Sequence, residues 1–341
     1  MREQIKKYII AFLIDLSLHS YLVLISHKVI YERMILGERF PEFNWNQPLC
    51  SLLIGLVITA MLFKTPLSVG RKAQGLLKDT GLAIFSQPHT WMIGIVILAT
   101  FVAGLKITQF SLIEFFSVAG IEGARRIFAD LLNPEWSILD QGLFAAIETI
   151  YMAFIATAFA LPFAFLISFF ASRNLMQVSR LTMFVYSMFR FIMNFCRSIE
   201  PLIWAIIFSV WVGIGPFSGM LALFIHSVVS LAKLYSEAIE SVSEGPIEAM
   251  TATGAHPIQV VWFGVVPQVV LPFLSFTIYR WDINVRMATV IGLVGGGGIG
   301  TLLMQYQGLA KWREVGLLIF LIAAIVWFMD WMSSKVREAI K

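Results

Sequence analysis

The chain has 341 residues, of which 58% are hydrophobic and 13% are charged, and its formal net charge is +4. An average soluble protein is about 45–50% apolar and about 25% charged. The composition therefore excludes a disordered chain, a nucleic-acid-binding protein and an ordinary soluble enzyme. It predicts an all-α polytopic membrane protein that lies in the lipid bilayer and has no nucleic acid among its partners.

Apolar segments recur along the whole chain, and a helix needs about 20 such residues to cross a bilayer. We predict membrane spans near residues 8–27, 48–64, 89–107, 143–171, 201–213, 217–236, 268–285 and 314–333. The first run has no cleavage motif, so we expect a retained helix. The fifth is too short to cross alone, and we expect it to continue a helix from 183–200 that bends at Pro201.

Lysines and arginines gather at the ends of alternate spans, where they predict the cytoplasmic side. They are Arg2, Lys6, Lys7, Lys64, Arg71, Lys72, Lys78, Arg173, Arg180, Lys335, Arg337 and Lys341. An even number of spans places both termini on that side. The 28–42 loop departs from this bias, because it holds three basic residues and is expected outside.

The segment 108–142 alternates charged residues, such as Glu114, Glu122 and Arg125, with apolar ones such as Phe128. This pattern is typical of an interfacial helix at the outer membrane surface. Two roles are open for it: packing against the membrane, or docking of a soluble partner.

A polar stretch, 233–268, separates two of the predicted spans. Gly245-Pro246 is expected to interrupt the helix there, with Pro246 in the first turn of a short helix over 247–253. Gly254 ends that helix, a turn follows, and 258–266 forms a second amphipathic piece. A helix–glycine–helix elbow of this kind is suited to docking at the cytoplasmic surface. An ordinary cytoplasmic hairpin is the other interpretation.

The elbow resembles the EAA loop of the inner-membrane permeases of bacterial ABC importers. The family pattern is Glu-Ala-Ala, three residues, glycine, nine residues, and Ile-x-Leu-Pro. Here Glu248-Ala249-Met250 is followed after three residues by Gly254, and Pro267 comes at the required distance. Met250, Gly264 and Val266 depart from the pattern.

The resemblance is strongest to the phosphonate-type branch of these permeases and covers about 147–300. The segments that carry it are Glu148-Thr149, 161–165, 173–175, 197–201, 213–216, 233–240, Tyr279-Arg280, 284–286 and 292–300. The resemblance implies a type I importer core of about five spans within 141–334. Residues 1–140 would be three accessory helices with the external segment, and 335–341 a cytoplasmic tail.

The same resemblance implies an ATP-driven importer of phosphonate or a related phosphorus oxyanion in the bacterial inner membrane. Its partners would be a second copy of the chain, two ATPase subunits that hold ATP and Mg, and an extracytoplasmic phosphonate-binding protein. The chain has no internal repeat, so a pathway on a two-fold axis requires the second copy. The residues expected to contact the ATPase lie in the elbow region 237–267: Glu240, Glu244, Glu248, Ala249, Gly254, Ala255 and His256.

Four consecutive glycines, Gly295, Gly296, Gly297 and Gly298, match a dinucleotide-binding pattern with Gly300, but no strand–turn–helix context surrounds them. They also lack the Lys-Ser/Thr of a P-loop. We therefore expect no ATP site, no metal site and no catalytic set in this chain. Two uses of the glycines are open: a small-residue face for helix packing, or an irregular segment beside the pathway.

Ionisable and polar groups within spans are candidates for the translocation pathway. With the four glycines they are Arg197, Glu200, Arg280, Asn284 and Arg286. Arg286 is an electropositive point for an anion, the partner of Asp282 or Glu148, or a side chain that extends to the membrane interface. For Arg197 and Glu200, a structural ion pair is favoured over contact with the substrate. Asp15 and His19 are expected to face another helix, with a proton relay as the less favoured role.

Three other functional classes remain open. A permease of a different importer branch, such as a methionine-like one, would share the elbow. A secondary transporter would leave the spacing from Glu248 to Pro267 unexplained. An integral-membrane enzyme would need a nucleophile or metal cluster at the membrane surface, and none is recognisable.

Overall fold

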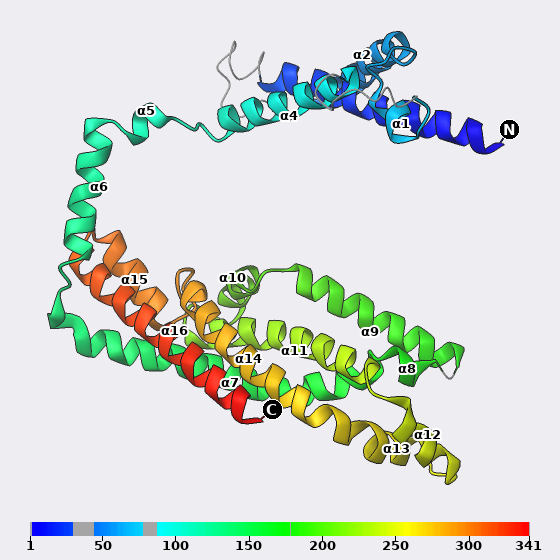
Figure 1. Ribbon diagram of the computed structural model, residues 1–341. Coiled ribbons are helices and arrows are strands. Elements are labelled where there is room, and N and C mark those ends of the chain that lie inside the picture. Colours follow the sequence, from blue (N-terminus) through cyan, green and yellow to red (C-terminus); the bar gives the residue numbers. More distant parts are fainter. Residues whose placement is uncertain (1, 30–43, 78–86, 178, 341) are drawn as a thin grey trace. The chain divides into compact units, whose positions relative to one another are not determined.

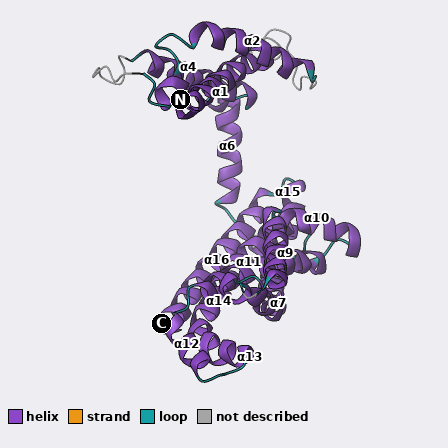
Figure 2. Cartoon of the chain, turned by 90° about the vertical axis from the view of Figure 1, so that its right-hand side faces the viewer, coloured by secondary structure: helices purple, strands orange, loops and turns teal. Residues whose placement is uncertain are grey.

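The computed structural model describes residues 2–29, 44–77, 87–177 and 179–340. Every regular element in these ranges is a helix, as Figures 1 and 2 show, which confirms the expected all-α class. The chain divides into two compact units, Met1–Gly120 and Ile121–Lys341. Most of the 28–42 loop lies outside the described residues, as do Lys78 and the terminal Lys341.

The first unit contains the helices of the N-terminal part of the chain. They are α1 (Arg2–Ile25), α2 (Asn46–Leu62), α3 (Val69–Ala73), α4 (Pro88–Ile107) and α5 (Leu112–Phe115), with the start of α6 (Val118–Leu131). Asp15 on α1 accepts hydrogen bonds from the Ser68 hydroxyl and, at 2.8 Å, from the Gly70 amide. The His19 ring lies 2.9 Å from the Thr59 hydroxyl of α2. Both side chains therefore hold helices together, as the packing interpretation predicts.

The second unit contains the remaining helices and begins within α6. They are η3 (Trp136–Ile138), α7 (Leu139–Phe170), α8 (Arg173–Met176), α9 (Arg180–Ser198), α10 (Pro201–Val212), α11 (Pro216–Glu240), α12 (Glu244–Ala252), α13 (Pro257–Val260), η4 (Val261–Val265), α14 (Val266–Gly292), α15 (Gly298–Gly308) and α16 (Trp312–Ile340). The segment expected to be interfacial, 108–142, is largely helical through α5, α6 and η3.

The apolar helices match the predicted spans. In the described residues, six helices are long and apolar enough to cross a membrane, and a bent pair, α9 with α10, counts as a seventh. The second predicted span is α2, a shorter apolar helix of 17 residues with a length of about 26 Å. The second unit thus holds five candidate spans: α7, α9–α10, α11, α14 and α16.

The junction of α9 and α10 differs from the expected bent helix. The two helices meet at 88°, so the chain breaks instead of bending. Glu200 is extended (φ −62°, ψ 141°), and Pro201 occupies the first turn of α10. A proline disfavours helical geometry in the residue before it, which ends α9 at Ser198.

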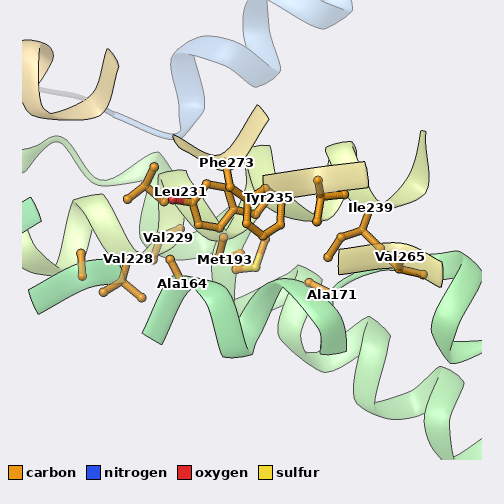
Figure 3. Packing of buried hydrophobic residues seen from close by; sticks show 13 residues of the cluster. Ala164, Ala171, Met193, Val228, Val229, Leu231, Tyr235, Ile239, Val265 and Phe273 are labelled. Atoms are coloured by element: carbon orange, nitrogen blue, oxygen red, sulfur yellow. The ribbon is translucent and has the colours of Figure 1, made fainter. Parts of the chain in front are cut away.

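The core of the second unit is built on α7 and α11, with α9 and α14 against them. In Figure 3, Tyr235 of α11 stacks on Phe273 of α14, with ring centroids 3.9 Å apart and an interplanar angle of 9°. Alanines of α7, such as Ala164, lie against the same cluster. Small residues on α7 allow α11 to pack closely along it.

Candidate functional site

The predicted elbow is present at the end of α11. A three-residue break, 241–243, separates α11 from α12, so the chain is interrupted before Gly245-Pro246 and not at these residues. Helix α12 begins at Glu244 instead of residue 247, and Pro246 lies in its first turn as expected. Gly254 follows α12 with φ +75°, and its N–H donates to the Thr251 carbonyl at 3.0 Å. Side chains are disfavoured in this left-handed conformation. The expected glycine stop is therefore confirmed.

The chain after Gly254 reverses through Ala255 and His256. The His256 side chain caps α13 by accepting from the Ile258 amide at 3.4 Å, and the Gln259 side chain accepts from the His256 amide at 2.9 Å. The second piece predicted over 258–266 is helical, as α13 and η4, but it does not end before the next span. Instead α13, the π-helical η4 and α14 follow one another without a break, as one apolar run from Pro257 to Gly292.

Pro267 explains the π-helical segment. A proline has no N–H to donate to the carbonyl four residues earlier, and η4 ends just before it, at Val265. A short π-helical turn inside an α-helix can accommodate the hydrogen bond that the proline cannot make. The proline of the family pattern thus shapes the base of the elbow.

Gln268 clamps the two ends of the elbow together. Its side-chain oxygen accepts from both the amide and the hydroxyl of Ser243, each at 3.1 Å. Its side-chain nitrogen donates to the Gly264 carbonyl at 2.7 Å. The start of α12 is thereby tied to the start of α14, so the elbow is anchored to a predicted membrane span.

The acidic residues of the elbow divide into two groups. Glu244 and Glu248 are exposed on α12, and no ion pair engages either within the described chain. Ala249 is exposed beside them. Glu240 instead pairs with Arg190 of α9 at 2.6 Å and accepts from the Arg173 amide at 2.7 Å. The position of Glu240 therefore favours a role inside the chain.

Replacing Glu240 with glutamine should destabilise the junction of α8, α9 and α11. It removes the Arg190 ion pair and weakens the acceptor for Arg173, at a cost of about 1 kcal/mol for a half-exposed site. We expect a lower midpoint of thermal unfolding in detergent. Glu237→Gln is the matched control. Glu237 is exposed, and its ion pair with Lys233 is longer, at 3.6 Å, so its loss should cost less stability. Equal midpoints for the two variants would contradict the assignment.

A groove of about 460 Å³ lies beside the elbow. Asn174 and Leu175 form one side of it, and Ala255, Pro257 and Ile258 form the other. Ile258 is 72% exposed. The groove and the exposed face of α12 together form the surface of the elbow that is available to a partner.

Gly295, Gly296 and Gly297 lie in the loop between α14 and α15, and Gly298 is the first residue of α15. Because α14 ends at Gly292, the small residues do not share one helical face and the segment is irregular. The glycines nevertheless allow close packing, since a Cβ at Gly292 would lie 2.7 Å from the Cα atom of Gly300. Gly295, Gly297 and Gly298 have φ values of +87°, +82° and +68°. The loop borders a cavity of about 820 Å³, which Asp140 and Glu148 of α7 also line. It is thus beside an open space, as a segment along a pathway would be.

Glu148 and Thr149 hold the glycine loop. Glu148 accepts from the Gly298 amide and the Thr149 hydroxyl accepts from the Ile299 amide, each at 2.9 Å. These amides begin α15, where N–H groups have no helical partner. Glu148 is therefore not the partner of Arg286.

Arg286 is paired with acids on two helices. It contacts Asp282 at 2.6 Å and Asp330 of α16 at 3.3 Å. The structural interpretation of Arg286 is thus the one that the geometry supports. The expected pairing of Arg197 with Glu200 is wrong, because no ion pair joins these two described residues and both are exposed.

Arg280 and Asn284 lie inside the second unit. Arg280 is 6% exposed, and its Nε donates to the Ser227 hydroxyl of α11 at 3.3 Å. Asn284 is fully buried and donates to Thr157 of α7 at 2.8 Å and to Ser227 at 2.7 Å. Three helices therefore meet at a polar cluster. We call Thr157, Ser227, Arg280 and Asn284 the mid-helix polar cluster.

Several of these residues carry no signal in a single sequence. Ser227, Thr157 and Asp330 are ordinary residues of apolar helices until folding places them beside Asn284 or Arg286. Gln268 lies next to the proline of the family pattern, which could have drawn attention to it. In the described residues, no group of three histidine, cysteine or acidic side chains is placed to hold a metal ion.

Comparison with known proteins identifies relatives over most of the chain. Residues 164–338 match the family described as the inner membrane component of binding-protein-dependent transport systems. A phosphite transport system permease protein of Stutzerimonas stutzeri is 36% identical over 248 residues, which cover 73% of this chain and 86% of that protein. A phosphate-import permease protein of Mycolicibacterium smegmatis is 34% identical over 230 residues, covering 66% of this chain and 42% of that protein.

A solved structure has the same fold. It is an inward-facing methionine ABC transporter, with a TM-score of 0.50 and 23% identity. The match covers 61% of this chain and 99% of the other.

Proposed function

The chain belongs to the family of inner membrane components of binding-protein-dependent transport systems, and we propose that it is the permease subunit of an importer for a phosphorus oxyanion. The observation that supports this most directly is the elbow. An exposed α12, a left-handed Gly254 and a base anchored by Gln268 form a rigid lever at the end of a predicted span.

The substrate class rests on the relatives. Two of the permeases to which this chain is similar are named for phosphite and phosphate. Phosphonate, phosphite and phosphate share a tetrahedral phosphorus with anionic oxygens. A pathway that carries any of them has to accommodate an anion of this shape, while a binding protein outside the membrane selects among them.

The proposed complex has two copies of this chain, two ATPase subunits and an extracytoplasmic binding protein. The second unit holds five candidate spans, and if these form one permease core, a central pathway requires a second copy of it. The chain would lie in the inner membrane with both termini cytoplasmic. ATP and Mg would be bound by the ATPase subunits, and this chain would contribute no step of the hydrolysis.

The proposed mechanism couples the elbow to the helices. The exposed face of α12, with Glu244, Glu248 and Ala249, would sit in a cleft of the ATPase together with the turn at Gly254, Ala255 and His256. Closure of the ATPase pair would move this lever, and the continuous run from Pro257 to Gly292 would carry the movement to the glycine loop. ATP would act through its different affinity for the two states of the complex.

Uptake measurements in the native host test the proposal. Cells that lack this chain should lose ATP-dependent uptake of radiolabelled phosphite, methylphosphonate or phosphate, and the restored gene should recover it. An ATPase subunit should co-purify with the tagged chain, and inactivating its P-loop lysine should abolish uptake. Loss of methionine uptake alone would indicate a different importer branch. Uptake that is unaffected by the ATPase variant would overturn the proposal in favour of a secondary transporter.

A further inference from the structure

The mid-helix polar cluster lies near the middle of three predicted spans. Arg280 is about as far from the start of α14 as from its end, and Ser227 and Thr157 hold similar positions on α11 and α7. At that depth an ionised side chain is costly and marks a functional site by default. Helix packing alone therefore does not explain the presence of Arg280 in the cluster.

The cluster contains a cation without a counter-charge. Arg280 forms no ion pair in the described chain, and its Nη2 atom is buried without a hydrogen-bond partner. Arg286, six residues later on the same helix, is neutralised by Asp282 and Asp330. Arg286 is therefore paired with acidic side chains, whereas Arg280 is not. Arg280 is the one whose positive charge remains available.

Other unsatisfied groups accompany Arg280. The Nδ1 atom of His226, the residue before Ser227, has no partner, and the charges that act on its ring are those of Arg280 and Arg197. The Oδ1 atom of Asn284 is also buried without a donor. Buried polar atoms are nearly always satisfied in a folded protein. Several unsatisfied polar atoms close to one cation therefore form a set of groups that an anionic ligand would satisfy.

We propose that Arg280, with Asn284 and His226, forms a transient binding site for the transported oxyanion at mid-membrane. This inference rests on the proposed function and assigns its site in the pathway. Arg280 would donate to the anionic oxygens of the substrate. The free oxygen of Asn284 would accept from a protonated P–OH group, which a monoanionic phosphite or phosphonate carries. Arg286 is excluded from this role because its charge is already paired.

The site is closed in the present conformation, since Arg280 is 6% exposed. Its one hydrogen bond to α11, the 3.3 Å contact to Ser227, is long, whereas the bonds of Asn284 to Thr157 and Ser227 are short. A small shift of α11 against α14 would release the guanidinium while Asn284 keeps the helices in register. The rocking that the elbow drives would thus expose the site during each cycle.

The first test is transport by the complete complex in proteoliposomes. Arg280→Gln should lower the maximal rate of phosphite uptake at least tenfold, and Arg280→Lys should lower it less because it keeps the charge. The amount of assembled complex and its ATP hydrolysis with the binding protein present should stay within twofold of wild type. The matched control is Tyr235→Phe, which removes a buried hydrogen bond to Thr277 between the same helices without changing charge. It should transport within twofold of wild type.

The second test separates charge from structure. Arg280→Cys is made with Cys50→Ser and Cys196→Ser, the only other cysteines of the chain. A thiol reagent that attaches an ammonium group should restore at least a third of the uptake, and one that attaches a sulfonate should not. Millimolar phosphite should slow the labelling at least threefold in the presence of ATP and binding protein.

The outcomes distinguish the site from the proposed function. Wild-type uptake of phosphite with no effect of Arg280→Gln would overturn the site and leave the function intact. Equal loss of assembled complex with glutamine and lysine, without rescue by the ammonium reagent, would assign Arg280 a structural role and also overturn the site. A wild-type complex that carries no phosphorus oxyanion would overturn the function first, and the site with it.

Discussion

Replacing Gly254 with aspartate is expected to lower ATP-driven uptake at least tenfold while the chain still folds and inserts. A Cβ at Gly254 would meet no atom within 4 Å, so the variant causes no clash inside the chain. The φ of +75° costs about 1 kcal/mol for a non-glycine residue, and aspartate tolerates it better than most. The new side chain and charge instead project from the tip of the elbow, where the ATPase is proposed to dock.

The measurement is substrate uptake together with co-purification of the ATPase. Gly75→Asp is the matched control, because Gly75 is also exposed, has φ +65° and has open space around it, but lies in the first unit. It should leave uptake within twofold of wild type. Normal uptake by Gly254→Asp would contradict the assignment of the elbow, and equal losses in both variants would show that backbone strain alone is responsible.

Replacing Gly297 with alanine should destabilise the second unit by about 3 kcal/mol or more. Its Cβ would lie 2.6 Å from the Cα atom of Pro216, and backbone atoms at the start of α11 cannot rotate away. The φ of +82° adds strain that only glycine avoids. We expect a strongly reduced yield of folded chain, or a midpoint of thermal unfolding lowered by several degrees, measured in detergent.

Gly213→Ala is the control for the strain alone. Gly213 also has positive φ, +94°, but a Cβ there would meet nothing within 4 Å. We expect a cost of about 1–2 kcal/mol for this variant, clearly smaller than for Gly297→Ala. Equal stability of the two variants would show that the glycine loop can move away from Pro216, contrary to the close packing in the structure.

The helices and the elbow were predictable because both depend on local information. Apolar segments of about 20 residues are long enough to satisfy their backbone inside lipid, and they located the spans in order. Gly254 acts within one helical turn, so the end of α12 could be inferred directly, whereas its start at Glu244 precedes the Gly245-Pro246 pair that was expected to interrupt the helix. The break between α9 and α10 was less predictable from the sequence. Pro201 predicts an interruption of the helix, but not the angle of 88° between the two helices.

The roles of the charged residues were not predictable in the same way. Arg280 and Arg286 lie six residues apart on one helix, and the sequence alone makes both of them candidates for binding an anion. Only the packing of α16 against α14 brings Asp330 to Arg286, and only the packing of α11 brings the neutral Ser227 to Arg280. Glu240 likewise was expected at the docking surface but is held by Arg190, 50 residues away in the chain.

The sequence by itself determined that this is a helical membrane protein with an elbow of the importer-permease type, because hydrophobic length and turn-forming residues act locally. The tertiary structure decided which arginine is neutralised, which acids remain exposed and what the four glycines do. Those properties depend on partners 40 to 150 residues distant, as in the bond from Gly298 to Glu148. Electrostatic compensation of a buried charge is a property of the folded neighbourhood, and it exists only once the helices are packed.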